Sequence, residues 1–264
     1  MRRLPTSALG FPAGPGSRRG RPVRRATQAL AALLAACCGT ALADPGYYVV
    51  TVYDDPGVKT ADFRYWGVRA AHGRQVDWPE VGFGWNVNGP WYTEVLASYI
   101  GTPVSALRID TLNWQNDLLL TRGQYPFDLA LHTLLVAPQM HDDVHTFEFG
   151  PVLQTDVGRT QLNFNLVFEH GYGRDNGNPT QLKYQWQVRH RWLRWLHVGA
   201  QGFGEVGTWN HWLPQQEQSH RAGPALFGSL PGGPGALSWQ AAWLEGKTYG
   251  RRGHMVTARA KYDF

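Results

Sequence analysis

The chain ends on RGHMVTARAKYDF, residues 252–264, in which apolar and polar side chains alternate. From Val256 to Phe264 every second residue is apolar, and the residues between them are polar or charged. A period of two places the two sets on opposite faces of a β-strand. The stretch therefore predicts a two-faced closing strand, either in a β-barrel or at the edge of a soluble β-domain.

The amino-terminal 43 residues have the composition of a secretory signal peptide. Residues 1–28 contain seven arginines and no acidic residue, residues 29–38 are apolar, and Ala41-Leu42-Ala43 supplies a small-x-small cleavage site. Cleavage after Ala43 leaves 18 basic and 20 acidic residues, a net charge of −2, so the basic leader gives no reason to expect nucleic acid. The long basic region is also compatible with a start codon further in.

A second processing site competes with the first. Leu34-Ala35-Ala36-Cys37 resembles a lipobox, whose processing would leave Cys37 acylated at the new amino terminus. The two sites stay open as alternatives. After cleavage at Ala43 the chain has no cysteine, which excludes disulfides, thiolate catalysis and thiolate metal sites.

After the leader, stretches of about ten alternating residues are separated by turn-forming residues. No apolar run approaches the ~20 residues that a membrane helix needs. The expected fold is all-β: a transmembrane antiparallel up-and-down β-barrel of about twelve strands over residues 59–264, with ten strands as the alternative. Residues 44–58 are expected to form a periplasmic tail. The predicted strands cover residues 60–68, 80–87, 91–100, 107–120, 127–137, 145–156, 160–170, 181–191, 196–208, 219–229, 237–248 and 253–264.

The predicted connections alternate in length. Those expected on the periplasmic side are short, whereas those expected outside, such as 69–79 and 209–218, are longer, as in bacterial barrels. Trp and Tyr also gather beside the connections, which is typical of the aromatic girdles at membrane surfaces. Both patterns favour a membrane barrel over a soluble sandwich.

The two faces of the predicted strands differ in chemistry. Leu162 and Phe164 share one face with their neighbours Tyr184 and Trp186. A one-residue slip would send Glu169, Lys183 and Arg189 into lipid, where a basic residue at the midplane costs ~2–4 kcal/mol. The other face is expected to line the lumen. Its candidates for a selective constriction are Glu80, Glu94, Arg64, Arg108, Asp110, Glu148, Lys183 and Arg189. The same charges also suit a structural role, in which they pair to satisfy buried polar groups.

Candidate catalytic and metal-binding residues are few. His141 and His145 lie four residues apart in a predicted outer loop, a weak pair with no evident third ligand, so no metal and no cofactor are expected. Outer-membrane deacylases use a His-x-Ser pair, and residues 44–264 contain none. The protein is therefore not expected to be an enzyme, although the outer-membrane protease type, with Asp and His on loops, stays open.

The closing strand resembles that of Gram-negative outer-membrane barrels, which end in Phe with a second aromatic two residues earlier, here Phe264 and Tyr262. Over residues 48–264 the chain also resembles outer-membrane proteins grouped with the meta-pathway phenol-degradation family. The stretches that carry this resemblance are EVGFGW (80–85), WYTE (91–94) with Ser98-Tyr99, RAGPALFG (221–228) and KYDF (261–264).

The resemblance implies export to the outer membrane, contact with outer-membrane lipid, and recognition of Tyr262 and Phe264 by the barrel-assembly machinery. It also implies a passive channel or uptake protein for small molecules, with hydrophobic or aromatic compounds as the class of solute. Two alternatives remain: a filled barrel with a structural or interaction role, and a secreted soluble β-domain that binds sugars through its Trp residues.

Overall fold

A computed structural model describes residues 47–52, 56–70, 73–103, 105–139, 144–173, 178–248 and 250–264. Within these ranges all regular structure is β-strand. No helix there has the length and apolar character that a membrane crossing requires. The strands are β1 (Lys59–Ala70), β2 (Gln75–Asn86), β3 (Trp91–Thr102), β4 (Ser105–Leu119), β5 (Asp128–Pro138), β6 (His145–Val157), β7 (Thr160–Tyr172), β8 (Gln181–His190), β9 (Leu196–Thr208), β10 (His211–Trp212), β11 (Ser219–Gly232), β12 (Gly235–Thr248) and β13 (Arg251–Asp263).

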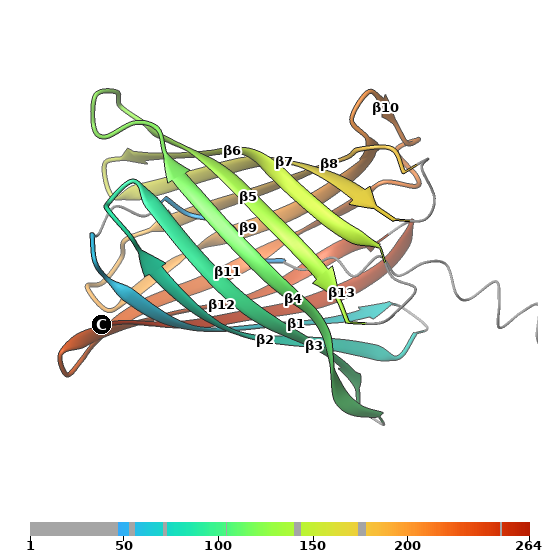
Figure 1. Ribbon diagram of the computed structural model, residues 1–264, viewed down its shortest axis with the longest axis horizontal. Helices are drawn as coiled ribbons and strands as arrows, with labels where there is room; N and C mark the ends of the chain where they lie inside the picture. The colour runs from blue at the N-terminus through green and yellow to red at the C-terminus, as the bar shows by residue number, and fades with distance from the viewer. Residues whose placement is uncertain are drawn as a thin grey trace, which may run out of the picture. The chain divides into compact units, whose positions relative to one another are not determined.

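The strands form one antiparallel sheet that closes on itself (Figure 1). The last strand pairs with the first, from Thr60 opposite Asp263 to Ala70 opposite Gly253. β10 is a two-residue extension that pairs with the end of β9, so the barrel itself has twelve strands. The expected up-and-down barrel of twelve antiparallel strands is confirmed.

Several strands are longer than the sequence predicts. β2 begins at Gln75, so most of the predicted loop 69–79 is strand. The sequence did not predict this longer strand because it contains Pro79, and proline lacks the N–H that a central strand uses for pairing. In the structure Pro79 pairs with Tyr65 of β1, whereas the β2–β3 pairing passes from Asp77 directly to Glu80. The turn predicted at 230–236 likewise shortens, because β11 ends at Gly232 and β12 begins at Gly235.

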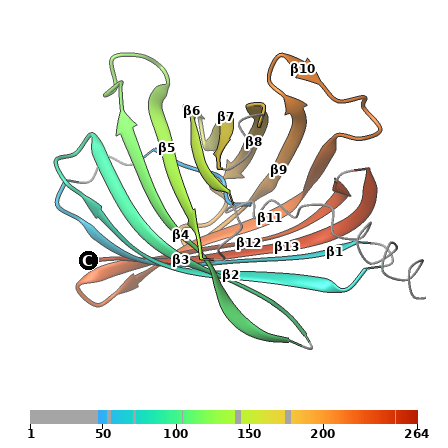
Figure 2. The same cartoon turned by 45° about the vertical axis from the view of Figure 1, so that its right-hand side comes forward.

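Both ends of the barrel sheet lie at the same end of the barrel, where Lys59 and Phe264 exchange backbone hydrogen bonds of 3.0 and 2.8 Å. Connections 87–90, 120–127, 158–159, 191–195 and 233–234 lie at this end, and we call it the terminal end. The opposite end, the loop end, includes connections 173–180 and 209–218 (Figure 2). The predicted difference in connection length therefore holds for 209–218, whereas 173–180 is no longer than 120–127 and the connection 71–74 is short.

The outer surface of the barrel is apolar. In β7 the exposed side chains of Leu162 and Phe164 alternate with the buried side chains of Asn163 and Asn165. Phe164 is 45 % exposed and Asn165 is fully buried, although an ordinary soluble fold would reverse this order. The apolar face predicted from the alternation therefore points outward, and the polar face encloses the lumen.

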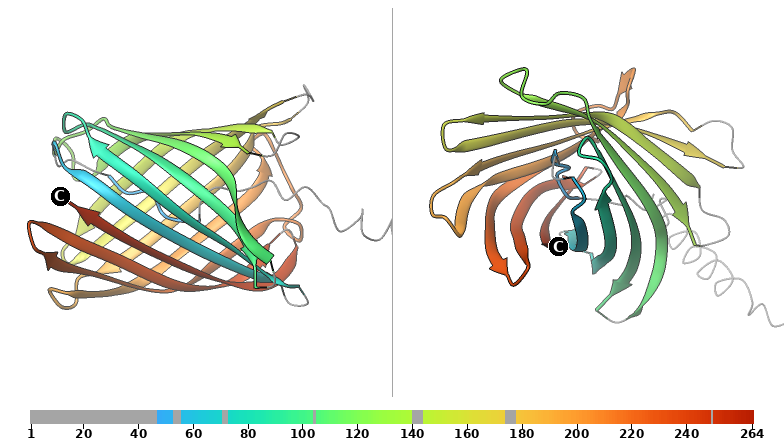
Figure 3. Two further views of the ribbon diagram at one scale, coloured as in Figure 1. Left: turned by 60° about the horizontal axis from the view of Figure 1, so that its bottom comes forward. Right: turned by 60° about the vertical axis from the view of Figure 1, so that its left-hand side comes forward.

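The segment before the barrel differs from its prediction. Residues 47–52, expected to form part of a tail outside the barrel, lie inside it, where Tyr47, Tyr48, Val49 and Val50 are buried (Figure 3). We call residues 47–52 the inner segment. Its side chains contact strands from both sides of the barrel, so the prediction of an external tail is wrong for these six residues.

Candidate functional site: the lumen and its inner segment

The inner segment reads YYVVTV and presents two faces to the barrel wall. Tyr47 and Val49 pack in one apolar cluster, whereas Tyr48 and Val50 pack in another. The first cluster contains Trp66, Phe203, Ala225, Phe227, Ala242, Leu244 and Met255 of the wall. The second contains Leu119, Ala130 and Val152. Because both faces of an extended segment are buried, an uninterrupted apolar sequence suits it.

The backbone of the inner segment bonds to amide side chains of the wall. Val50 N donates to Gln185 Oε1 at 3.1 Å, and Asn165 Nδ2 donates to Val50 O at 2.9 Å. Asn165 Nδ2 also donates to Gln185 Oε1, at 2.9 Å. A buried peptide group without hydrogen-bond partners is costly in free energy. The Asn165 and Gln185 side chains therefore supply the hydrogen bonds that a neighbouring strand would otherwise make to Val50.

Arg64 of β1 is the centre of a buried ion cluster. Its Nε donates to Asp62 Oδ2 at 2.7 Å, and its Nη2 donates to Glu94 Oε2. Its Nη1 lies 3.9 Å from Glu80 Oε2. The Arg64 side chain is 1 % exposed, so carboxylates rather than bulk water balance its charge. The register pairs Glu94 with Gly84, and Glu94 Oε1 lies over Gly82, 3.0 Å from the position that a Cβ would take there.

Tyr48 covers this cluster from the lumen side. The Arg64 guanidinium carbon lies 3.7 Å from the centroid of the Tyr48 ring, in a cation–π contact. The Tyr48 hydroxyl donates to Gln115 Oε1 at 2.8 Å, and that oxygen also lies 3.3 and 3.4 Å from the two terminal nitrogens of Arg64. Arg259 of β13 donates to Asp62 from the other side, at 2.7 to 3.0 Å. The central cluster comprises Asp62, Arg64, Glu80, Glu94, Gln115 and Arg259.

Oxygens without protein partners lie beside the central cluster. Glu80 pairs with Ser98 across β2 and β3, and Ser98 pairs with Thr111 across β3 and β4. Among the described residues, Glu80 Oε2, Glu94 Oε1, Ser98 Oγ and Thr111 Oγ1 have no hydrogen-bond partner. Buried oxygens of this kind require water or a polar solute. This wall therefore offers several polar oxygens to water or to a polar solute in the lumen.

A second polar cluster holds the inner segment nearer the loop end. Tyr47 OH donates to Glu205 Oε1 at 2.7 Å, and Arg221 Nη2 donates to both, at 2.8 and 2.5 Å. The Arg221 guanidinium carbon lies 4.1 Å from the Tyr47 ring centroid, and Phe203 contacts the same ring edge to face. Each tyrosine of the inner segment therefore contacts one arginine and one hydrogen-bond acceptor of the wall.

Two further predicted residues form an ion pair. Lys183 lies 3.4 Å from Glu148 Oε1 and also bonds to Glu169 Oε2. Arg189 lies apart from them: its Nε donates to His197 Nδ1 at 2.7 Å. Arg189 also lines a lumen cavity of about 170 Å³ that Val49 and Thr51 of the inner segment border. The other cationic residues of this cavity are Arg259 and Lys261.

The last two lumen candidates, Arg108 and Asp110, differ in their position. Asp110 is buried, whereas Arg108 is exposed and joins neither cluster. The pairing of β3 with β4 shifts between Ser98 and Tyr99, and β5 pairs with β4 only from Thr111 onward. Arg108 therefore lies on the part of the β3–β4 hairpin that extends past the next strand, although it has the inward parity of Asp110.

One residue of the weak metal pair lies outside the part of the chain that the structure describes. His145 is exposed at the start of β6, and His141 lies outside the described residues. No group of three or more His, Cys, Asp or Glu side chains suited to a metal ion occurs in the part of the chain that the structure describes.

Sequence reasoning missed the two tyrosines and a buried His–Asp pair. Asp117 Oδ1 and His132 Nδ1 lie 2.6 Å apart, and Gln115 Nε2 donates to Asp117 Oδ2 at 2.6 Å. Alternation along β4 contained the signal for Gln115 and Asp117, because both have the parity of buried Asn113. For Tyr47 and Tyr48 the only available signal was an apolar, β-branched run too rich in Tyr and Val for a solvated tail.

Comparisons with known proteins show the fold. No family model matches the sequence, and no curated protein matches it. The structure is similar to the crystal structure of an outer-membrane channel from Pseudomonas putida F1, with a TM-score of 0.58 and 11 % identity over 84 % of this chain and 99 % of that chain. The KdgM porin has a TM-score of 0.45 and 9 % identity, over 76 % of this chain and 97 % of the porin. The translocator domain of the autotransporter NalP from Neisseria meningitidis has a TM-score of 0.44 and 12 % identity, over 91 % and 98 % of the two chains. The likeness to the Pseudomonas channel agrees with the antiparallel β-barrel fold of this chain.

Proposed function

We propose that the protein is an integral outer-membrane channel whose lumen is occupied by its own inner segment. The observation that carries the proposal is the inversion of the two faces: Phe164 and its neighbours point outward, and ionised side chains are enclosed. Such an outer face needs a lipid environment, because a soluble barrel would bury it. The same inversion argues against the secreted sugar-binding domain.

The passive transport of small molecules is supported by the polar lumen. The cavity beside Val49 and Thr51, lined by Arg189, Arg259 and Lys261, is the space left between the inner segment and the wall. Arg259 and Lys261 of this lining pair with Asp62 and Asp263. Arg189 bonds to the His197 ring instead, and its charge favours solutes with an anionic group. Hydrophobic or aromatic compounds are the class that the resemblance of the sequence suggests, and an aromatic acid would combine both features.

The filled barrel with a structural role is the second candidate. It is favoured by the number of bonds that fix Tyr47 and Tyr48, since a lumen filled in this way passes little current. The two candidates differ in what happens when the inner segment leaves. In a gated channel its removal opens a path, whereas a structural barrel would lose stability without gaining conductance.

Planar-bilayer recording tests the proposal. The chain from Asp44 onward is compared with a variant that lacks residues 47–52, after a gel-mobility test that confirms heat-sensitive folding of both. The expected result is a small or intermittent current for the full barrel and a larger, steady current for the shortened variant. If the shortened variant folds and inserts but conducts no more than the full barrel, the channel proposal fails and the structural role is retained.

A further inference from the structure

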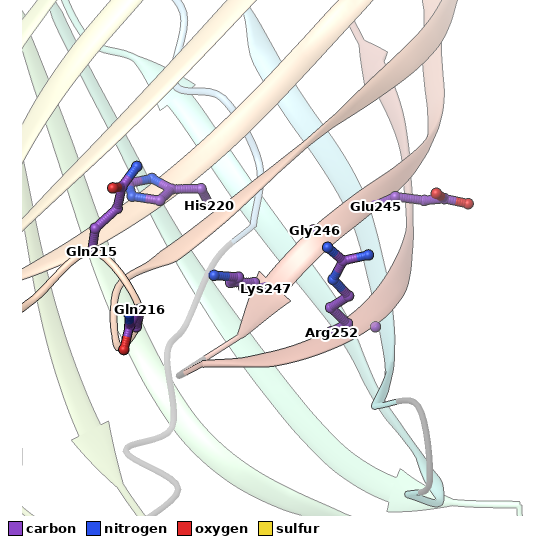
Figure 4. A pocket seen from close by; sticks show the side chains of 8 residues that line it. Gln215, Gln216, His220, Glu245, Gly246, Lys247 and Arg252 are labelled. Carbon is purple, nitrogen blue, oxygen red and sulfur yellow. The ribbon is translucent and has the colours of Figure 1, made fainter.

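A hollow lined by basic and amide side chains lies on the outer face of the barrel at its loop end. It has a volume of about 700 Å³ (Figure 4). The basic rim site, as we call it, comprises Gln215, Gln216, His220, Lys247 and Arg252; Glu245, Gly246 and Gly253 complete the lining. It lies outside the lumen, and the proposed transport function does not use it.

The strand register puts the basic side chains in one row. His220 of β11 is opposite Lys247 of β12, and Lys247 is opposite Arg252 of β13. These residues alternate with the buried, lumen-facing Leu244 and Met255, so they project from the outer face. Lys247 and Arg252 are the second residue pair from the β12–β13 turn, which lies at the loop end of the barrel.

The apolar belt ends just below this row. Trp243 is 46 % exposed on the same face of β12 as Lys247, and its ring stacks on His254 at 4.8 Å. Amphipathic aromatic rings prefer the headgroup level of a membrane. If the barrel spans a membrane, Trp243 therefore marks the boundary of the hydrocarbon region, and Lys247 and Arg252 lie among the lipid headgroups.

The charges of the site are not neutralised by the protein. Within the described ranges neither Lys247 nor Arg252 forms an ion pair. The Glu245 side chain points away from both (Figure 4), and its Oε1 accepts a hydrogen bond of 3.3 Å from Trp243 Nε1. Two unpaired cations beside amide donors form a site for an anion with several acceptor oxygens.

The His220 ring is held in place by two hydrogen bonds. His220 Nε2 lies 2.8 Å from Gln218 Oε1, and its Nδ1 lies 2.8 Å from the Tyr184 hydroxyl. Tyr184 reaches across Gly204, where a Cβ would lie 2.1 Å from its ring. The imidazole is therefore fixed from two sides and forms a rigid flank of the site beside Lys247 and Arg252.

We propose that the basic rim site binds the phosphate group of a phosphorylated lipid in the outer leaflet of the membrane. The proposal rests on the proposed function, because it needs the barrel to span the outer membrane with its loop end outward. The outward position of the row, just above the apolar belt, selects a lipid-borne phosphate over a soluble one: acyl chains then lie against the belt while the phosphate meets Lys247 and Arg252.

The test is a titration of the folded barrel in maltoside detergent, read by native mass spectrometry. The probes are diphosphoryl lipid A, chemically dephosphorylated lipid A and inorganic phosphate. The variant K247Q/R252Q is expected to bind diphosphoryl lipid A roughly thirtyfold more weakly than the unmodified chain, from the usual gain per basic residue near an anionic surface. The charge-conserving variant K247R/R252K should retain binding.

The matched control R122Q/R194Q removes two exposed arginines at the terminal end and should bind as the unmodified chain does. The proposal is overturned if K247Q/R252Q binds equally well, if the control loses as much affinity, or if dephosphorylated lipid A or inorganic phosphate binds as tightly. Conductance of K247Q/R252Q is expected to be unchanged. A barrel that folds but inserts into no bilayer would instead refute the proposed function, so the two failures are distinguishable.

Discussion

Replacing Tyr48 should release the inner segment from the lumen. The Tyr48 side chain is 6 % exposed, its ring lies 3.7 Å from the Arg64 guanidinium carbon, and its hydroxyl donates to Gln115 Oε1 at 2.8 Å. Tyr48→Ala removes the buried ring, its cation–π contact and its hydrogen bond while leaving the barrel strands unchanged. Truncation of a buried aromatic ring typically costs about 3–5 kcal/mol.

The lower limit of that range sets the expected effect. A loss of about 3 kcal/mol changes the ratio of released to docked inner segment roughly 150-fold. Tyr48→Phe keeps the ring over Arg64 and loses one hydrogen bond, worth about 1 kcal/mol or roughly a fivefold change. The ratio of released to docked inner segment should therefore be highest for Tyr48→Ala, clearly lower for Tyr48→Phe, and lowest for the unmodified chain.

Single-channel recording measures this ratio as the fraction of time spent in the open state. Tyr125→Ala is the matched control, because Tyr125 is exposed in a turn at the terminal end and touches no lumen residue among those described. Equal open fractions for Tyr48→Ala and the control would refute the reasoning. So would a Phe variant that opens as much as the Ala variant, since the ring rather than the hydroxyl is expected to dominate.

Three other substitutions test separate parts of the structure. Arg64→Met leaves Glu94 buried without its cation and should lower the free energy of unfolding by about 3–5 kcal/mol, measured by urea titration in detergent. Phe164→Arg puts a cation on the lipid face and should cost about 2–4 kcal/mol in lipid vesicles, whereas Gln124→Arg in a turn should cost almost nothing. Phe264→Ala removes the ring that contacts Phe83 and Tyr262. The substitution should slow barrel assembly in cells, measured as a larger unfolded fraction on unheated gels. Normal assembly of the variant would show that Phe264 is not the closing signal.

The barrel was predictable because its strands obey one simple rule. Leu162 and Phe164 alternate with Asn163 and Asn165, and a strand in a barrel wall meets lipid on one face and the lumen on the other. The same periodicity located Arg64, Glu80 and Glu94 on the inner face. Their convergence was harder to predict, because it depends on the relative stagger of β1, β2 and β3.

The position of Arg108 and the burial of the inner segment could not be predicted, because they depend on contacts that produce no periodic pattern in the sequence. Arg108 has inward parity, but an irregular β3–β4 pairing places it on a projecting hairpin. The inner segment contacts the wall on both faces, so its alternate residues are equally buried and the sequence shows no alternation. Its partners, Gln115 and Arg221 among them, are separated from it by 67 and 174 residues. Only the closed barrel brings such distant residues together.

The central claim, that lipid meets the apolar face and the lumen encloses the polar one, is tested most directly by spin labels along β7. Single cysteines from position 162 to 166, in a chain with Cys37 and Cys38 replaced by serine, are labelled and the barrel is reconstituted in lipid vesicles. Oxygen, which concentrates in hydrocarbon, should relax the labels at 162, 164 and 166 more than those at 163 and 165. A water-soluble nickel chelate should not reach the even-numbered labels. Uniform accessibility, or collisions with the chelate at positions 162 and 164, would contradict the account.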